Sequence, residues 1–356
     1  MPVIHIDKRN SLGLHAGDWV VVRSKEEILA TLDREGRLDR LPFQPEMFAY
    51  CGQRLRVAKV AHKTCNNIDK TIGRGRRMHN AVHLDGARCD GSRHGGCQAD
   101  CVFFWKEAWL KRADARNADA VSGPGRGCAE QDVQRAVVAA GQEGASDPTW
   151  VCQTTALLDA TDPLPWWKMS QYVRDVTSGN QRAWHMIKLM VAAVYRYIVG
   201  IGFGYRYLIG FYDWFQRMRG GKPFPRITGQ IAAGGQTPTE ILNLQPGEWV
   251  EIKPKEEIAA TLNARSYNRG MWYDIEMLKY SGGRYRVQMR VDRLINEQTG
   301  KMMLMKSPCI QLEDVYCRAE CTDGRLGCPR ASNTYWREIW LRRVSAPESG
   351  SGSRAV

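Results

Sequence analysis

Residues 17–57 (GDWVVVRSKEEILATLDREGRLDRLPFQPEMFAYCGQRLRV) return without a gap as residues 247–287 (GEWVEIKPKEEIAATLNARSYNRGMWYDIEMLKYSGGRYRV). The two stretches share 17 identical residues at a constant shift of 230. The matches include the opening Gly-x-Trp-Val, the run Lys-Glu-Glu-Ile and the closing Arg-x-Arg-Val. Self-similarity of this extent indicates that one folded module occurs twice in the chain.

The likeness resumes at a shift of 231, where Trp-Lys-Glu-Ala-Trp-Leu at 105–110 matches Trp-Arg-Glu-Ile-Trp-Leu at 336–341. We expect this hexapeptide to be a closing strand, with its tryptophans in the core. One helix per copy is predicted to begin at the capping box Ser24…Glu27 and at Pro254. Further strands are predicted at the following ranges: 54–61, 81–84, 285–291 and 309–312.

Several short strands with one inserted helix predict a mainly β fold with added helices. In this prediction, two repeated small SH3-like β barrels are joined by a helical, aromatic-rich middle segment. The predicted division is a first metal-binding barrel over 14–113, a linker with a short helix over 114–163, a basic aromatic helical segment over 164–226, a second metal-binding barrel over 240–344 and a disordered tail over 345–356.

Composition and charge are those of a soluble, basic protein. Of the 356 residues, 43% are hydrophobic and 25% charged, as in soluble globular proteins. The net charge of +13 favours an anionic partner: nucleic acid, an acidic membrane surface or an acidic polymer. The first 19 residues lack the apolar core of a secretory signal, so we expect a cytoplasmic protein. Clustered thiols in that compartment are more often metal ligands than disulfides.

Cysteines gather at matching places in the two copies. Cys89 pairs with Cys317, and Cys97 with Cys328. The predicted ligands of the first ion are Cys65, Cys89, Cys97 and Cys101, with His94 as a substitute for one of them. Those of the second ion are Cys309, Cys317, Cys321 and Cys328. Thiolate-rich sets of this kind favour tetrahedral zinc, and we expect two ions, with an iron–sulfur cluster as the alternative.

Three more histidines, His62, His79 and His83, lie near the first cysteine cluster and have no counterpart in the second copy. They are predicted either to orient the ligands or to bind metal themselves. If they bind metal, a metalloenzyme or an iron–sulfur redox protein becomes the alternative function. Whether the protein is an enzyme stays open at this stage.

Two surfaces are candidates for partner binding. Arginines alternate with apolar residues at matched positions of the two copies, which predicts a basic strand face that could contact nucleic-acid phosphates: Arg54, Arg56, Arg284 and Arg286. The middle segment combines many aromatic residues with arginine and lysine at helical spacing. Its helices are expected either to lie in a membrane interface or to pack onto the barrels.

The combination of Gly-Asp-Trp-Val, the Trp-x-Glu-x-Trp-Leu hexapeptides and the cysteine loops resembles an uncharacterised bacterial family, over 17–344. That resemblance implies tandem SH3-like barrels around a basic aromatic middle and a setting in surface polysaccharide or secondary-metabolite biosynthesis. It implies no activity and no catalytic residue. The leading hypothesis is therefore a zinc-stabilised binding or accessory protein that acts with a biosynthetic enzyme or at a membrane surface.

Overall fold

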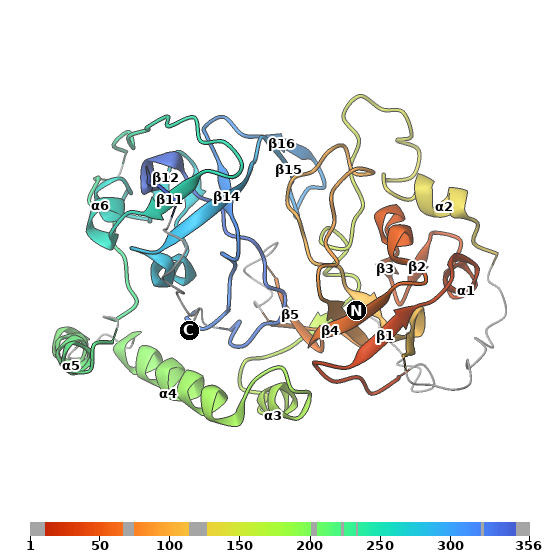
Figure 1. The fold of residues 1–356 in the computed structure, drawn as a ribbon, viewed down its shortest axis with the longest axis horizontal. Helices are drawn as coiled ribbons and strands as arrows, with labels where there is room; N and C mark the ends of the chain where they lie inside the picture. The colour runs from red at the N-terminus through yellow and green to blue at the C-terminus, as the bar shows by residue number, and fades with distance from the viewer. Residues whose placement is uncertain are drawn as a thin grey trace. The chain divides into compact units, whose positions relative to one another are not determined.

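The computed structural model describes residues 11–66, 75–113, 127–200, 205–221, 224–232, 234–321 and 324–346. The chain forms two compact units (Figure 1). Unit 1 comprises residues up to Tyr195 together with Arg293–Leu304 and Arg318–Ser332. Unit 2 comprises Arg196–Asp292, Met305–Cys317 and the chain from Asn333 onward. Two segments of the second sequence repeat therefore belong to unit 1.

The main sheet of unit 1 has five antiparallel strands in the order β8-β7-β4-β1-β9. Val20 of β1 lies opposite Leu55 of β4, and on its other side opposite Arg112 of β9. The strands of this sheet are β1 (Trp19–Val22), β4 (Arg54–Val60), β7 (Ala81–Leu84), β8 (Trp105–Lys106) and β9 (Leu110–Arg112). Around them lie α1 (Lys25–Leu29), the hairpin β2 (Arg37–Leu38) and β3 (Leu41–Pro42), and the 3₁₀ helix η2 (Pro45–Tyr50).

Smaller elements complete unit 1. A three-stranded sheet has the order β10-β6-β5, and the separate hairpin of β15 and β16 comes from the second repeat. The elements are β5 (Lys63–Cys65), β6 (Gly75–Arg77), α2 (Glu130–Arg135), β10 (Asp162–Pro163), α3 (Ser170–Thr177), β15 (Arg293–Ile295) and β16 (Met302–Leu304). Helix α4 (Ala183–Gly200) begins in unit 1 and ends in unit 2.

Unit 2 contains a four-stranded sheet in the order β17-β14-β11-β18. It repeats the register of unit 1, since Val250 of β11 lies opposite Tyr285 of β14 as Val20 lies opposite Leu55. The elements are α5 (Tyr205–Met218), β11 (Trp249–Ile252), α6 (Lys255–Ala260), β12 (Tyr267–Asn268), β13 (Met271–Trp272), η4 (Ile275–Tyr280), β14 (Arg284–Arg290), β17 (Ile310–Leu312), η5 (Glu338–Trp340) and β18 (Leu341–Arg343).

The prediction of a mainly β fold with two closed SH3-like barrels is wrong. The structure is 24% helix and 22% strand, in small antiparallel sheets, and none of the described sheets closes into a barrel. The hexapeptide at 105–110 shows the reason. It is not one strand but a two-residue strand, the 3₁₀ helix η3 (Glu107–Trp109) and a second strand, and the two strands lie at opposite edges of the sheet.

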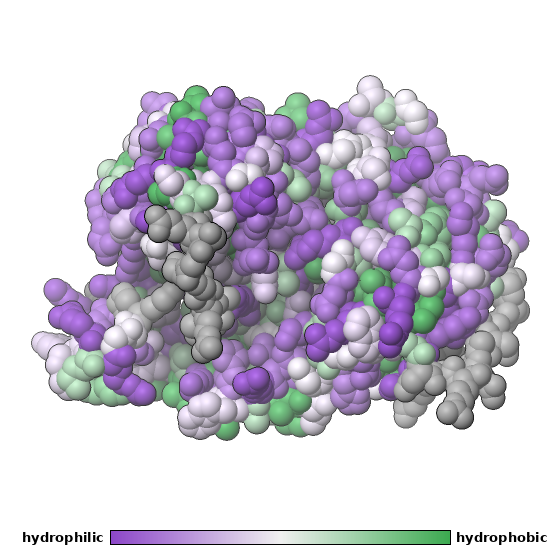
Figure 2. Space-filling model, in the orientation of Figure 1, coloured by the Kyte–Doolittle hydropathy of each residue, from purple (hydrophilic) through white to green (hydrophobic). Residues whose placement is uncertain are grey.

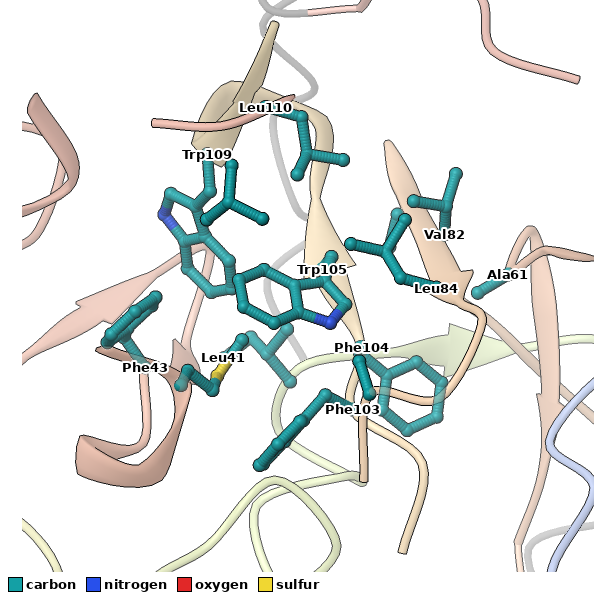
Figure 3. Close-up of a cluster of buried hydrophobic side chains, with 14 of the residues drawn as sticks. Leu41, Phe43, Ala61, Val82, Leu84, Phe103, Phe104, Trp105, Trp109 and Leu110 are labelled. Carbon is teal, nitrogen blue, oxygen red and sulfur yellow. The ribbon is translucent and has the colours of Figure 1, made fainter. Parts of the chain in front are cut away.

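The two cores use the same contacts at equivalent positions. Trp105 and Trp109 are fully buried, as are Trp336 and Trp340, which confirms the expectation of core packing. The Trp109 indole lies edge-on to Phe43 with centroids 5.1 Å apart, and Tyr273 meets Trp340 at the same distance. Figure 3 shows Trp105, Trp109 and Phe43 converging with Leu41, Phe103 and Phe104 in unit 1.

The glutamate of each hexapeptide accepts hydrogen bonds from the backbone just before Gly17 or Gly247. Glu107 accepts hydrogen bonds from the backbone of Leu12 and Gly13. Glu338 accepts them from the backbone of Leu242, Asn243 and Leu244, at 2.7–3.0 Å. Gly13 and Asn243 both have positive φ, which glycine and asparagine tolerate best.

The helices begin where the sequence predicts. Ser24 and Glu27 form the capping box of α1, and Pro254 caps α6. The middle segment is helical as α3, α4 and α5. Among the described residues, no helix is both long enough and apolar enough to cross a bilayer.

Candidate metal centre

Three potential metal ligands converge in unit 1. Glu46 is carried by η2, because Pro45 begins that 3₁₀ helix and directs its first turn toward the loop that follows β7. Cys89 and His94 lie in that loop. One ligand atom of each residue can be chosen so that all three lie within 4.8 Å of one another, and no other such group is found among the described residues.

The loop is shaped by backbone hydrogen bonds. The Cys89 amide donates to the carbonyl of Cys101 at 2.8 Å, and the His94 amide donates to that of Gly91 at 2.9 Å. Gly91 has φ of +69°, and a Cβ there would lie 2.0 Å from the carbonyl oxygen of Cys97. Only glycine therefore permits this turn, which places His94 back over Cys89.

Two of the three ligands are buried, and Cys89 is half-buried. His94 is 1% exposed and Glu46 is 9% exposed. Trp150 covers one side, since its ring centroid lies 6.3 Å from that of His94, and a Cβ on Gly95 would collide with it. The Arg93 amide closes another side by donating to Glu46 Oε1 at 3.1 Å.

Both ring nitrogens of His94 face hydrogen-bond acceptors. Its Nδ1 lies 2.7 Å from Glu46 Oε1, and its Nε2 lies 3.1 Å from the carbonyl oxygen of Val151. Both neighbours are acceptors; an imidazolium donates to both of them, whereas a neutral imidazole has a single N–H. A cation held by Nδ1 and the carboxylate would leave Nε2–H to donate to Val151, which is how metal-bound histidines are commonly oriented.

Glu46 also has unused capacity. Its Oε2 is buried and has no hydrogen-bond partner, while Oε1 lies 3.9 Å from Cys89 Sγ. Burial by itself would raise the pKa of Glu46, but the hydrogen bond and charge of His94 outweigh it and hold the pKa below its ordinary value. A buried carboxylate oxygen without a donor is costly unless something positive meets it.

Cys89 is poorly suited to act as a nucleophile. Burial, and then the Glu46 carboxylate, raise the pKa of its thiol far above the ordinary value. The reactive form of cysteine is the thiolate, which such surroundings suppress in the absence of a cation. The geometry of the three residues thus fits a metal site better than a catalytic triad.

The other predicted ligands of the first ion, Cys65, Cys97 and Cys101, lie outside the group formed by Glu46, Cys89 and His94. Cys97 Sγ accepts a hydrogen bond from the Ile295 amide at 3.4 Å, and burial raises its pKa. Burial also raises the pKa of Cys101 above its ordinary range. Cys65 is hydrogen-bonded by Cys328, which lowers its pKa to about 6. None of these three thiols belongs to the group around Glu46.

The contacts of Cys65 and Cys97 are equivalent in the repeat. Ile295 stands in the second copy where Cys65 stands in the first, and Cys328 matches Cys97. The two contacts therefore join equivalent positions of the repeat with the copies exchanged: a backbone amide donates to Cys97, whereas Cys65 and Cys328 meet through their side chains. Arg330 supports the second of them by donating to the Cys65 carbonyl at 3.3 Å and to Glu297 at 2.5 Å.

The ligands predicted for a second ion are divided between the units. Cys309 and Cys317 belong to unit 2, whereas Cys321 and Cys328 belong to unit 1. Burial raises the pKa of Cys309 to about 12. The second ion stays a prediction. No disulfide joins any of the eleven cysteines, all of which lie in the described part of the chain.

The three additional histidines each have their own environment. His62 Nε2 lies 3.3 Å from Asp175 Oδ1, and His79 Nε2 lies 2.8 Å from Asp162 Oδ2. His83 Nδ1 donates to the carbonyl of Phe103 at 2.8 Å. These contacts explain the histidines as parts of the packing of unit 1, away from the Glu46 group.

The buried imidazole of His83 predicts sensitivity to acid. Burial lowers its pKa from 6.5 to about 4. The folded chain thus binds fewer protons than the unfolded one, and the contribution to stability that is complete above pH 6.5 is lost as the pH falls toward 4. From about pH 7 to pH 5, we expect the unfolding free energy of His83→Asn to fall less than that of the wild type, by about 2 kcal/mol.

Urea unfolding at the two pH values measures this difference. Asparagine keeps a donor for the Phe103 carbonyl, so it removes the titration with the smallest change in packing. Other groups that titrate in this range contribute equally to both proteins and cancel. An identical pH dependence in the two proteins would show that His83 is not held neutral.

The arginines of the predicted basic strand face are exposed, but three of them lie beside an aromatic ring or a glutamate. Arg54 lies over the ring of Trp19, 4.7 Å from its centroid. Arg284 and Arg286 lie 3.5 and 3.7 Å from Glu251 and Glu313. These neighbours reduce the positive field that a nucleic-acid phosphate would meet.

Sequence reasoning missed Glu46. A signal existed, because Glu46 and Glu276 are identical in the ungapped repeat just as Cys89 matches Cys317, and both glutamates are buried. A buried acidic residue kept in both copies is a stronger ligand candidate than spacing alone suggests. No family model, curated protein or solved structure matches this chain.

Proposed function

We propose that the protein is a zinc-binding accessory protein whose unit 1 is stabilised by an ion held by Glu46, Cys89 and His94. The observation that carries this proposal is the convergence of a carboxylate, a thiol and an imidazole in one group, together with the buried, unpartnered Glu46 Oε2. Thiolate, imidazole and carboxylate are the donors that zinc uses in proteins, whereas magnesium and calcium select oxygen.

The burial of Glu46 and His94 favours a structural role; Cys89 is half-buried, and three protein ligands leave a fourth position for another donor. Catalytic zinc keeps a coordination position open to water or substrate, whereas structural zinc is enclosed. His94 is almost fully covered, and the Trp150–Val151 segment lies over it. A single thiolate beside nitrogen and oxygen donors also favours one ion over an iron–sulfur cluster, which needs several thiolates.

Metal analysis of the full-length protein, purified without chelator, tests the proposal. We expect about one zinc per chain in the wild type, and strong loss in Cys89→Ser, His94→Ala and Glu46→Gln. Cys128→Ser is the matched control, because Cys128 is a half-buried cysteine of the same unit outside the group. Cys65→Ser and Cys328→Ser should also retain the ion.

Cobalt substitution adds a spectroscopic test of the ligands that does not depend on how much zinc survives purification. Cobalt bound at the site should give a thiolate-to-metal absorption band that Cys89→Ser lacks and Cys128→Ser keeps. Equal zinc content in the wild type and in a folded His94→Ala variant would contradict the proposal. Stoichiometric iron with acid-labile sulfide would replace it with the cluster alternative.

A further inference from the structure

Helix α4 is apolar on two faces. One face packs in unit 1, where Met186 and Leu189 join Tyr172 and Leu326 in a small buried cluster. The other face carries a line of five large apolar residues spaced three and four apart, which places them along one side of the helix. This α4 stripe consists of Trp184, Ile187, Val191, Val194 and Ile198, each between 45% and 66% exposed.

Helix α5 carries a similar line. Its α5 stripe consists of Tyr207, Phe211, Trp214 and Met218, again spaced four, three and four apart. These side chains are between 52% and 86% exposed. Apolar side chains in such a row are unusual on a helix that faces only water. Green and white residues reach the surface where α4 runs in Figure 1, among purple ones (Figure 2).

The charges carried by α4 and α5 themselves are nearly all positive, although Glu320 lies 4.0 Å from His185 of α4. Between residues 182 and 219 the sequence contains six basic residues and a single acidic one, Asp213. Asp213 is half-buried, and its carboxylate accepts a hydrogen bond from the Phe224 amide at 2.6 Å. The exposed basic residues of this region are Arg182, Lys188, Arg206, Arg217 and Arg219.

Cations also lie directly beside exposed rings. Lys188 Nζ is 5.7 Å from the centroid of the Trp184 ring, and the Arg219 guanidinium carbon is 5.3 Å from that of Phe215. Aromatic rings next to lysine or arginine, on a helix with an apolar side, are typical of segments that lie in the headgroup region of a bilayer.

A second copy of the chain fits these stripes less well. The α4 stripe spans only two heptads, and α4 contains no acidic residue to pair with Lys188 or Arg196 of another copy. The α5 stripe is largely aromatic, unlike a coiled-coil seam. Nucleic acid fits less well too, because bases stack on rings, whereas Ile187, Val191, Val194 and Ile198 offer none.

We propose that α4 and α5 bind the surface of an anionic lipid bilayer, with their stripes among the acyl chains and headgroups and their basic residues against lipid phosphates. Anionic headgroups supply the charge that the helices lack, and the bilayer interior takes up the apolar side chains. This inference is independent of the zinc site.

Vesicle flotation of the full-length protein tests it. We expect binding to vesicles that contain about one-third phosphatidylglycerol in phosphatidylcholine, and much weaker binding to phosphatidylcholine alone or at high salt. The double variant Val191→Glu/Val194→Glu should bind roughly a hundred-fold more weakly, because two apolar contacts are lost and two charges would have to enter the interface.

Ile241→Glu is the matched control, since Ile241 is 70% exposed and lies outside both stripes. It should bind like the wild type, and all variants should keep their circular dichroism and metal content. Equal binding of the double variant and the wild type would overturn the proposal. So would the absence of vesicle binding combined with a dimer that the double variant dissociates, because the stripes would then be an interface between copies.

Discussion

Asp175→Ala is expected to destabilise unit 1 by about 3–5 kcal/mol, the largest effect of any single charge removal we foresee. Asp175 is fully buried, and its carboxylate accepts a hydrogen bond from Lys63 Nζ at 2.5 Å. Lys63 also donates to the Leu326 carbonyl at 2.7 Å and lies 5.0 Å from the centroid of the Tyr172 ring. Without Asp175, a buried ammonium group would have no opposite charge.

Urea unfolding monitored by circular dichroism measures this loss. The control is Asp147→Ala, which removes the exposed partner of Lys301, 3.2 Å away, and should cost less than about 1 kcal/mol. Lys63→Met combined with Asp175→Leu should recover most of the stability, because neither charge then remains buried. A loss below about 1 kcal/mol for Asp175→Ala would show that Lys63 reaches water or loses its proton.

Trp109→Ala and Trp340→Ala are expected to cost about 3–5 kcal/mol each, in units 1 and 2 respectively. Both rings are fully buried, and both donate from Nε1 to a threonine hydroxyl, Thr31 at 3.1 Å and Thr261 at 2.9 Å. Alanine would leave a cavity next to a ring, Phe43 or Tyr273, that has lost its edge contact. The threonine hydroxyl would keep only its bond to the carbonyl of Ile28 or Ile258.

Hydrogen exchange read by mass spectrometry assigns each loss to its unit. In Trp109→Ala, the amides of β1 and β4 should exchange faster while those of β11 and β14 change little, and Trp340→Ala should give the converse. Trp19→Ala, at a ring that is 48% exposed, is the control and should leave both patterns near the wild type. Equal acceleration in both units from either variant would show that they unfold as one.

The repeat correctly predicted where several strands and helices begin, because these starts depend on short local sequence patterns. Trp19 and Trp249 open equivalent strands, and Ser24 and Pro254 begin the expected helices. The same patterns did not specify sheet closure. The sequence around Glu107 is compatible with a strand. In the structure Glu107 begins a 3₁₀ turn, and its carboxylate accepts a hydrogen bond from the Leu12 amide.

The ligand group was predicted only in part. Cys89 and His94 share one loop, so their proximity follows from short spacing, whereas Glu46 reaches them from a separate helix. Cys65 and Cys328 are 263 positions apart in the sequence, and their contact depends on two segments of the second copy being part of unit 1. Spacing along a chain carries no information on such an exchange.

Glu107 and Glu338 also indicate where the repeated module begins. Glu107 and Glu338 accept hydrogen bonds from backbone that begins at Leu12 and Leu242, five residues before Gly17 and Gly247. A fragment cut at the glycine would strip a buried carboxylate of the amides that solvate it. The repeated module therefore begins no later than Leu12 and Leu242, and its leading leucines agree, since Leu12 and Leu14 match Leu242 and Leu244 at the same shift of 230.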